Sequence, residues 1–356
     1  MLGLGCAQAQ QASWQIGPFT RPTAGNPVIS PLPDATFTDP ILKKPIQWEA
    51  LHTFNPAAIV RKDKVFVLYR AEDNTGAMEI GGHTSRLGLA ESKDGIHFKR
   101  RGAPVFTPAE DGQKAREWPG GVEDPRIVES NDGTYVLTYT QWNRETYSVG
   151  IATSRDLLHW TKYGPAFLTA AGGKFAHLKY KSAGIVTRLD PRKKRLIAAK
   201  INGFYWMYWG EGIIRLATST DLIHWTPVDG PHGSVELLGP RPGHFDSTFP
   251  ETGPPPVLTR AGIVVLYNGK NAESGGDTAL EPNAYAAGEA LFMASNPVVK
   301  ITQTDEPVLK PELPYEKTGQ YKAGTTFAEG LVWFHKRWFL YYGCADSLVA
   351  VATAPA

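Results

Sequence analysis

Apolar residues recur along the chain in short runs that each end in polar residues. The pattern occurs five times, and each run follows a shorter apolar segment across a turn, with Asp-Gly, Asp-Pro-Arg or Ala-Gly at several reversals. Such pairs are typical of β-hairpins, and no window longer than about ten residues shows the 3.6-residue apolar period of a helix. The five runs are VFVLYRAED from Val65, YVLTYTQWN from Tyr135, LIAAKING from Leu196, IVVLYNGKN from Ile263 and WFLYYGCAD from Trp338.

Five copies of one hairpin predict an all-β fold in the form of a single five-bladed β-propeller, with an N- or C-terminal strand completing the ring. We expect residues 21–356 to form this one domain. Residues 1–20 are expected to be a flexible segment outside it, which resembles the tail of a secretory signal with Ala7-Gln8-Ala9 as a cleavage site. We therefore expect a periplasmic or secreted protein. Lipid attachment at Cys6 and an ordinary flexible start are the other interpretations.

A second repeat joins strands within the predicted blades. Three segments nearly superimpose: GLAESKDGIHF from Gly88, GIATSRDLLHW from Gly150 and RLATSTDLIHW from Arg215. Ser and Asp side chains bind the backbone that follows them, so Ser-x-Asp predicts a turn between two strands. These Ser, Asp and His residues are no catalytic triad, because a feature present in several modules belongs to the scaffold.

Composition excludes several classes of protein. The chain of 356 residues is 42% hydrophobic with a formal charge of +2, which predicts a large folded core. No apolar stretch approaches the roughly 18 residues of a membrane span. The basic stretch Arg192–Arg195 lies between apolar segments and is interpreted as a solvated turn, so no nucleic-acid partner is expected. Two cysteines, Cys6 and Cys344, at opposite ends of the chain indicate no disulfide framework.

The hairpins differ from one another where their first strands begin, which is the place where a propeller opens on its central channel. The polar residues at these starts are Asn55, Glu123, Asp124, Lys181, Ser182, Glu251 and Glu329. The second strands end in Arg70, Gln141, Lys200, Asn268 and Asp346, and aromatic residues stand nearby at Trp118, Trp142, Trp206, Trp209 and Tyr267. Carboxylates can act as acid and base, and aromatic faces pack on pyranose rings. This combination predicts a sugar site.

The motifs FNPAAIV, Tyr69-Arg70-Ala71, SRLGLAESKDGIHF, GVEDPRIV, KINGFYW, GPPPV and YYGCAD occur in this order between Phe54 and Asp346. In them the chain resembles glycoside hydrolase family 130, the inverting β-mannoside phosphorylases and β-mannosidases. The resemblance implies that Asp124 is the general acid, acting through a mannose hydroxyl, and that Asn55, Arg70 and Asp346 hold the sugar. Trp118, Lys181, Tyr267 and Asn268 are further candidates for substrate binding. Arg126 either binds substrate or forms a salt bridge with Asp124 or Glu123.

Three departures from the phosphorylase pattern of this family favour hydrolysis. The chain has Tyr208-Trp209-Gly210-Glu211 in place of a His-Arg-Pro stretch, Asn268 in place of a His, and Phe249-Pro250-Glu251 in place of Lys-Ile-Gly. A buried phosphate needs cations, whereas a carboxylate pair suits a water nucleophile that must lose a proton. We therefore expect hydrolysis, in which Glu211 and Glu251 position and deprotonate water. Which of the two is the base stays open. The arrangement resembles the hydrolytic branch of the family, which implies an inverting, exo-acting β-mannosidase active on β-1,2-mannosides.

The alternatives are a β-mannoside phosphorylase that forms α-mannose 1-phosphate and a propeller that binds sugar without catalysis; an arabinan-cleaving enzyme matches the motifs less well. The expected partner is a β-mannoside oligosaccharide from mannan degradation, and the oligomeric state stays open. Nine histidines are scattered without the spacing of a zinc site. We therefore expect no metal and no organic cofactor.

Overall fold

The computed structural model describes residues 12–230 and 233–355, so the interpretations of Cys6 and of Ala7-Gln8-Ala9 lie outside the described residues. The regular secondary structure of the described chain is almost entirely β-strand, which confirms the prediction of an all-β fold. Helical segments are short: α1 (Lys114–Glu117) and the 3₁₀ turns η1 (Ala170–Gly173) and η2 (Pro314–Glu316). None of the helices in the described ranges is long and apolar enough to cross a membrane.

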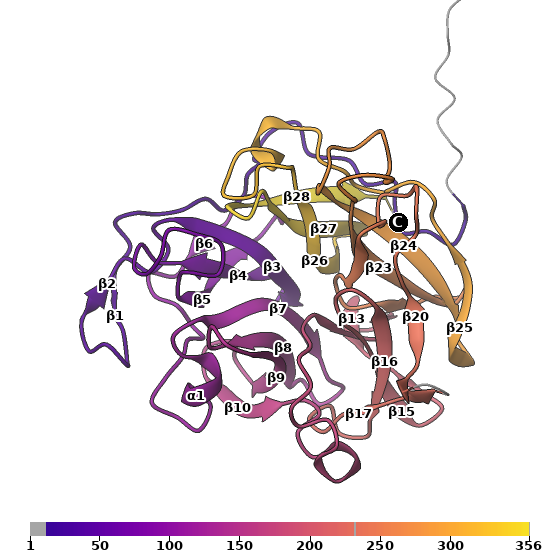
Figure 1. Ribbon diagram of the computed structural model, residues 1–356, viewed down its shortest axis with the longest axis horizontal. Coiled ribbons are helices and arrows are strands. Elements are labelled where there is room, and N and C mark those ends of the chain that lie inside the picture. The colour runs from indigo at the N-terminus through magenta and orange to yellow at the C-terminus, as the bar shows by residue number, and fades with distance from the viewer. Residues whose placement is uncertain (1–11, 231–232, 356) are drawn as a thin grey trace, which may run out of the picture.

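The strands form five mainly antiparallel groups, numbered here one to five, which are arranged around a common centre (Figure 1). Along the chain, β12 and β13 of group four come between strands of group three. Group one holds β3 (His52–Arg61), β4 (Lys64–Glu72), β5 (Ser85–Ser92) and β6 (Lys99–Arg100). Group two holds β7 (Gly121–Glu129), β8 (Tyr135–Trp142), β9 (Tyr147–Ser154) and β10 (Trp160–Pro165). Group three holds β11 (Ala183–Ile185), β14 (Lys200–Ile201), β15 (Phe204–Trp209), β16 (Ile214–Ser219), β17 (Thr226–Pro227) and β20 (Glu236–Leu238).

Group four holds β12 (Thr187–Asp190), β13 (Arg195–Ala198), β21 (Phe249–Thr252), β22 (Val257–Leu258), β23 (Ile263–Lys270), β24 (Tyr285–Met293) and β25 (Asn296–Gln303). Group five holds β26 (Thr326–Phe334), β27 (Arg337–Cys344) and β28 (Leu348–Ala354). Two small ribbons lie outside the groups: β1 (Phe37–Thr38) with β2 (Pro45–Ile46), and β18 (Asp229–Gly230) with β19 (Gly233–Ser234).

Neighbouring groups are held together mainly by side chains. A single parallel bridge, Ser85 with Gly121, joins groups one and two. The short parallel pair of β12 with β22 lies within group four. Apolar clusters fill the spaces between groups one and two, two and three, three and four, four and five, and five and one. The last of these clusters packs Ala58 of β3 against Val332 of β26, so the end of the chain contacts its beginning.

The N-terminal segment adds to the fifth group. Thr20 pairs with Thr353 and Ile29 pairs with Val349, both on β28. Ile16 and Phe19 are already buried in the core, before the domain start that the sequence suggested at residue 21. The backbone N–H of Ile16 donates to the carboxylate of Glu289, a fully buried residue of β24.

All five predicted hairpins form, but the position of the third differs from the prediction. Its run from Leu196 does pair with the preceding strand as β12 and β13, and Asp190 to Arg195 close the turn. The strand that pairs with β11 and leads to the centre is β15 instead, and Lys200 is exposed. The hairpin of β12 and β13 therefore belongs to group four, and the central polar residue of group three is Glu211, which follows β15.

The Ser-x-Asp repeat forms three identical surface turns, as its interpretation as scaffold requires. In the first turn the Ser92 hydroxyl accepts the Gly95 N–H, and Asp94 accepts the backbone N–H groups of Ile96 and His97. The His97 ring contacts the same Asp94 carboxylate at 2.7 Å, and both side chains are exposed. The turns at Asp156 and Asp221 repeat these bonds.

Candidate active site

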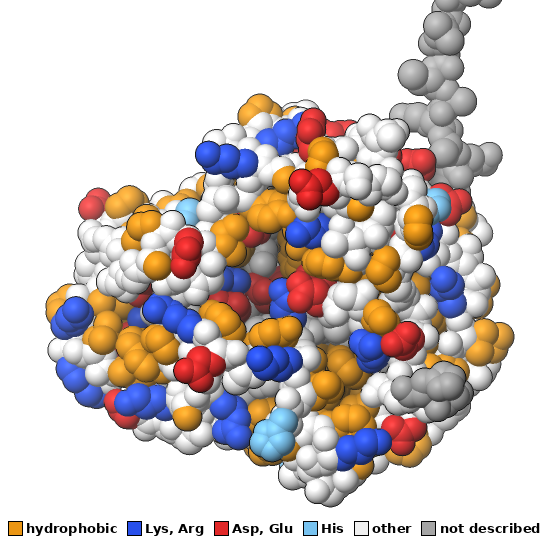
Figure 2. Space-filling model, in the orientation of Figure 1, with side chains coloured by type: hydrophobic (Ala, Val, Ile, Leu, Met, Phe, Trp, Pro, Cys, Tyr) orange, Lys and Arg blue, Asp and Glu red, His pale blue; other side chains and the backbone are white. Residues whose placement is uncertain are grey.

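A cavity of about 310 Å³ opens at the centre of the face shown in Figure 2, where acidic and basic side chains are visible in the hollow. This volume is at the lower end of the range for ligand pockets, which starts at about 300 Å³. Seven predicted site residues line it, from all five strand groups and the segments between them: Asn55, Arg70, Asp124, Lys181, Glu211, Glu251 and Asp346.

Local backbone irregularity turns these side chains into the cavity. Pairing between β3 and β4 slips by one residue at Asn55, and pairing between β7 and β8 slips at Asp124. Both residues have a left-handed backbone, with φ of 44° and 46°, as do Ser182 at 56° and Asp346 at 51°. A bulge inserts an unpaired residue and redirects its side chain, and Asn and Asp tolerate the left-handed region better than most residues.

Asp124 lies in a cationic environment. Its Oδ1 atom accepts hydrogen bonds from Asn55 Nδ2 at 2.9 Å and from Arg70 Nη1 at 3.1 Å. Burial raises the pKa of Asp124, but the charges of Arg70 and Lys181 outweigh burial and hold the pKa below its usual value. Without substrate, Asp124 is therefore a carboxylate.

Other carboxyl groups lie near Arg70, and two of them, Glu123 and Asp346, have raised pKa values. Arg70 Nη2 lies 2.9 Å from Glu123 and 2.7 Å from Glu72. Burial, together with the charge of Asp124, raises the pKa of Glu123 to about 7 against the attraction of Arg70. Burial likewise raises the pKa of Asp346 to about 7. Arg70 thus lies among carboxyl groups whose pKa values differ. The pKa of Asp124 is lowered, and those of Glu123 and Asp346 are raised.

The opposite wall of the cavity carries Lys181 between two glutamates. Its Nζ lies 3.0 Å from Glu211 and 3.6 Å from Glu251, and the two glutamates form a backbone bridge. Burial and the charge of Glu211 raise the pKa of Glu251 to about 7, while Lys181 and a hydrogen bond from the Ser182 hydroxyl lower it. Glu211 is about a third exposed, whereas Glu251 is buried. Burial lowers the pKa of Lys181, but both glutamates outweigh it and raise the pKa well above its usual value.

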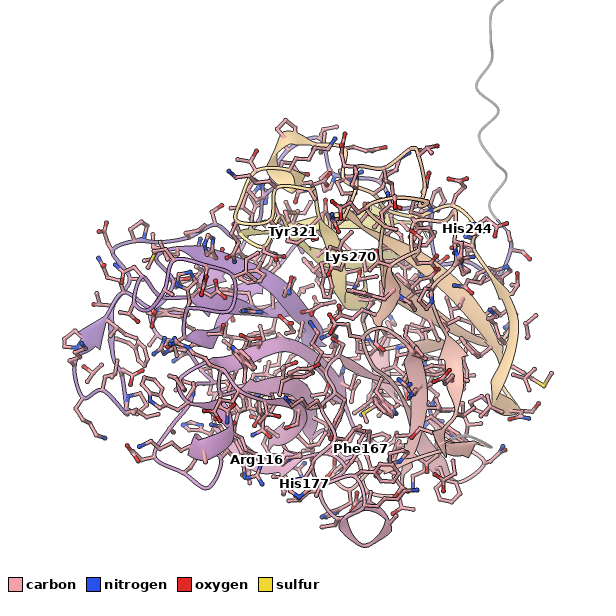
Figure 3. All side chains as sticks on the ribbon, in the orientation of Figure 1. Arg116, Phe167, His177, His244, Lys270 and Tyr321 are labelled. Carbon is pink, nitrogen blue, oxygen red and sulfur yellow. The ribbon has the colours of Figure 1, made fainter. Side chains whose placement is uncertain are left out.

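Aromatic side chains complete the lining. They are Phe54, Trp142, Tyr147, Tyr285, Tyr321 and Phe327. Tyr321 lies on the segment before β26, above the central opening in Figure 3. Of these six, the sequence analysis singled out Trp142, while Phe54 entered only within a motif. Tyr147, Tyr285 and Tyr321 stand outside the repeated first and second strands, so comparison of the hairpins could not find them.

Four predicted binding residues do not line the cavity. Trp118 is half-buried elsewhere, and the hydroxyl of buried Tyr267 bonds to Asp246. The amide of Asn268 is fully buried, donates to the carbonyl of Ala328 and accepts its N–H, so it joins two strand groups. Tyr267 and Asn268 lie on β23, which pairs with the strand of Glu251, but their side chains are buried in the protein.

Arg126 has a structural role and does not line the cavity. It pairs with buried Glu329 at 3.0 Å and donates to the carbonyl oxygens of Thr252 and Gly253. Its contact with Asp124 is to the backbone oxygen, at 3.0 Å. Of the two expected roles, the structural one fits, although the carboxylate partner is Glu329 instead of Asp124 or Glu123.

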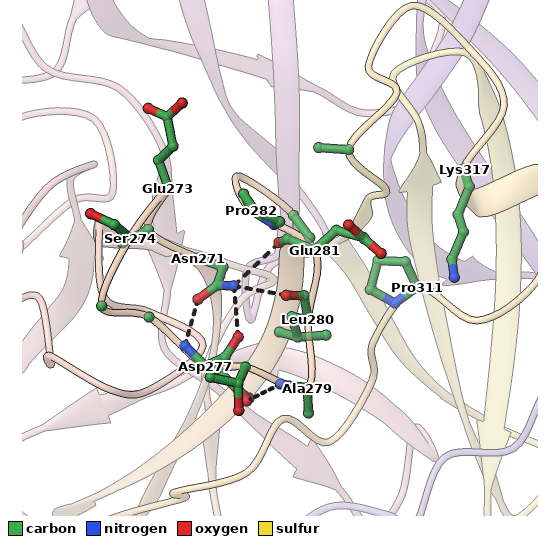
Figure 4. Close-up of a pocket in the computed structure, with 16 residues that line it drawn as sticks. Asn271, Glu273, Ser274, Asp277, Ala279, Leu280, Glu281, Pro282, Pro311 and Lys317 are labelled. Carbon is green, nitrogen blue, oxygen red and sulfur yellow. Dashed lines mark hydrogen bonds between the residues drawn. The ribbon is translucent and has the colours of Figure 1, made fainter.

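A second cavity of about 460 Å³ lies in the loop between β23 and β24 (Figure 4). The Asn271 amide holds this loop by donating to the carbonyls of Asp277, Leu280 and Glu281 and accepting the Asp277 N–H. The loop's internal bonds account for these polar groups. The cavity has no aromatic lining, so it lacks the features of the central site.

Residues 27–356 match the profile of Glyco_hydro_130, described as beta-1,4-mannooligosaccharide phosphorylase. The chain belongs to glycoside hydrolase family 130. Within this family, it is 31% identical over 310 residues to a 1,2-beta-oligomannan phosphorylase of Thermoanaerobacter sp. (strain X514), covering 86% of this chain and 90% of that protein.

Two solved structures are more similar to this family 130 chain. A glycosyl hydrolase from Bacteroides ovatus is 51% identical with a TM-score of 0.94, covering 97% of this chain and 96% of that one. Another solved structure is 51% identical with a TM-score of 0.95, covering 98% of this chain and 97% of that one. Its description states that the GH130 family of mannoside phosphorylases contains glycoside hydrolases that target beta-1,2 mannosidic linkages in Candida mannan. The chain is therefore a member of a family that acts on β-mannosides.

Proposed function

We propose that this protein is an inverting, exo-acting β-mannosidase that cleaves terminal β-1,2-linked mannose with water as the nucleophile. The observation that carries the proposal is the charge of the cavity lining. Five carboxyl groups (Glu123, Asp124, Glu211, Glu251, Asp346) face two cations (Arg70, Lys181), and each cation already pairs with carboxylates. A small, central cavity suits removal of one terminal sugar.

Phosphate fits this lining poorly. Two like charges about 4 Å apart repel by about 4 kcal/mol at the effective dielectric constant of a protein surface. A phosphate beside Glu211 and Glu251 would meet this repulsion unless both carboxyl groups took up protons. Water carries no charge, and a carboxylate at this position can accept the proton that the attacking water loses.

Glu251 is the better base of the pair. A general base works best when its pKa is close to the working pH, and burial brings Glu251 to about 7. The hydroxyl of Ser182 fixes its position. Glu211 pairs more closely with Lys181, and we assign it to holding that lysine and the water.

Asp124 is proposed as the general acid, although it is ionised before substrate binds. The proton must therefore reach it in the substrate complex. Sugar binding excludes water, which disfavours the charged form, and Glu123 next to it holds a proton near neutral pH. We propose that Glu123 and Asp124 share one proton as a coupled pair, from which Asp124 delivers it toward the leaving oxygen.

We also propose that the five strand groups are the blades of a β-propeller. Packing of group five on group one and the pairing of Thr20 and Ile29 with β28 support a closed ring. The central cavity then lies at one end of the channel, where the innermost strands meet.

The second candidate is a β-mannoside phosphorylase. Two observations support it. The relative of 31% identity is named a phosphorylase, and Lys181 provides a cation on the side of the cavity where the nucleophile would bind. The two candidates differ in their product. We expect β-1,2-mannobiose to give free mannose at the same rate with and without millimolar phosphate. Formation of α-mannose 1-phosphate as the main product would replace the proposal by the second candidate.

A further inference from the structure

Two histidines and a glutamate meet beside the active-site cavity without taking part in its lining. One nitrogen of His52, one nitrogen of His83 and one carboxylate oxygen of Glu72 all lie within 4.8 Å of one another. His52 pairs directly with Glu72 across β3 and β4, and Glu72 pairs with Ser85 on β5. Since His83 stands two residues before Ser85, the strand register brings all three side chains to one face of the sheet.

The hydrogen bonds of the two imidazoles leave one nitrogen of each available. His83 Nδ1 lies 3.3 Å from the carbonyl oxygen of Thr75, which can only accept, so Nδ1 carries the proton and Nε2 keeps its lone pair. His52 Nδ1 lies 2.9 Å from the hydroxyl of Ser347. No hydrogen bond reaches Nε2 of either ring from the described residues. A histidine held at one nitrogen by an oxygen, with the other nitrogen free, is the arrangement that metal ligands adopt.

The surrounding charge favours a cation. Glu72, Glu123 and Asp124 all pair with Arg70, so three carboxylates share one guanidinium. Oε1 of Glu72 accepts hydrogen bonds from Arg70 and Ser85, whereas Oε2 accepts one from Gln320 at 3.2 Å and retains a further lone pair.

We propose that His52, Glu72 and His83 bind one divalent transition metal ion, for which zinc is the expected species. Two imidazoles and a carboxylate are a typical zinc set, and bonds of about 2.0–2.2 Å fit a cluster of this size after small side-chain rotations. Calcium and magnesium prefer all-oxygen sites.

The ion would act by holding the cavity rim and not by taking part in the reaction. His83 ends the segment 73–84, which contributes Ile80 and Gly81 to the cavity. On the other side, Ser347 and Gln320 contact the cluster, and they stand next to Asp346 and Tyr321 of the cavity. One ion would thus fix three segments of the rim, so its removal is expected to raise KM more than it lowers kcat.

The test uses the full chain, stripped with a chelator and titrated with Zn²⁺ in the absence of substrate. We expect one Zn²⁺ per chain by calorimetry and elemental analysis, with a rise in Tm. His52→Gln and His83→Gln should each lose at least tenfold in affinity together with the rise in Tm. His177→Gln, which removes an exposed imidazole far from the cluster at the lower edge of Figure 3, should bind as the wild type does.

Cobalt offers a readout that needs no stable variant. Co²⁺ bound to the wild-type chain should give visible absorption bands that Zn²⁺ abolishes. The proposal is wrong if the wild type binds neither ion at one site per chain. It is equally wrong if a folded His83→Gln chain, checked by circular dichroism, binds Zn²⁺ undiminished. Because metal binding is measured without a mannoside, either result leaves the proposed mannosidase activity to its own test.

Discussion

Replacement of Glu251 by Gln tests the chemistry of the site most directly. The substitution keeps the shape of the side chain and an oxygen that can accept the Ser182 hydrogen bond, but it removes the group that would take a proton from water. General base catalysis contributes about 10²- to 10⁴-fold. We therefore expect kcat on β-1,2-mannobiose to fall by this factor, while substrate binding survives.

The pH profile adds a second, independent readout. The base must be ionised, and burial places the pKa of Glu251 at about 7. Hence kcat/KM of the wild type should fall as pH drops below about 7, and Glu251→Gln should lack this acidic limb. Ser182→Ala removes a hydrogen bond to the carboxylate, worth about 1.5–3 kcal/mol. That loss should move the limb upward by roughly one to two pH units, since one unit corresponds to about 1.4 kcal/mol.

Initial rates between pH 4.5 and 9, with Glu211→Gln as the matched control, separate the outcomes. Glu211→Gln should lower kcat but keep an acidic limb. The reasoning is refuted if Glu251→Gln keeps wild-type turnover, or if the limb disappears in Glu211→Gln and persists in Glu251→Gln.

Two further predictions concern other carboxyl groups. Asp124→Asn should lower kcat on mannobiose by about 10²- to 10⁴-fold and affect an aryl mannoside with a good leaving group much less, because that group needs no proton; equal losses on both substrates in parallel rate measurements would contradict an acid role. Burial raises the pKa of Glu289 to about 8, so the native state holds a proton that the unfolded state releases above its ordinary pKa of 4.5. Stability should therefore fall as pH rises from about 4.5 to 8, by up to about 1.4 kcal/mol per pH unit, and Glu289→Gln should remove this part of the loss in urea unfolding series. An unchanged pH dependence in that variant would show that Glu289 does not titrate as described.

The hairpin pattern predicted the all-β class and the residues at the strand starts, because both depend on local sequence. Asn55, Asp124 and Glu251 stand where apolar strands begin, and their approach to one another follows from the repeat alone. The third hairpin forms, but its second strand does not end at the site as expected, because LIAAKING has the same apolar period as β15, the strand that does. Periodicity identifies a strand but not its partner.

Side-chain direction was harder to predict than position. Tyr267 and Asn268 lie on the strand that pairs with Glu251 and its neighbour, yet both point into the protein. A shift of one residue in strand pairing moves a side chain to the opposite face of the sheet. The register shifts at Asn55 and Asp124 cannot be recognised from the amino-acid composition of these strands. The meeting of His52 and His83, 31 positions apart in the chain, depends on strand register in the same way, so spacing rules for metal sites could not detect it.

The left-handed backbone at Asn55, Asp124, Ser182 and Asp346 restricts how this cavity can be re-engineered. Each of these positions accepts a short polar residue or glycine at low cost, whereas a β-branched or bulky side chain there is strained. The backbone conformation at these four positions thus limits which side chains the cavity can carry there, whatever the ligand. Libraries that aim at new sugars should leave these four positions unchanged and vary the aromatic lining residues Tyr147, Tyr285 and Tyr321, whose backbone is not left-handed.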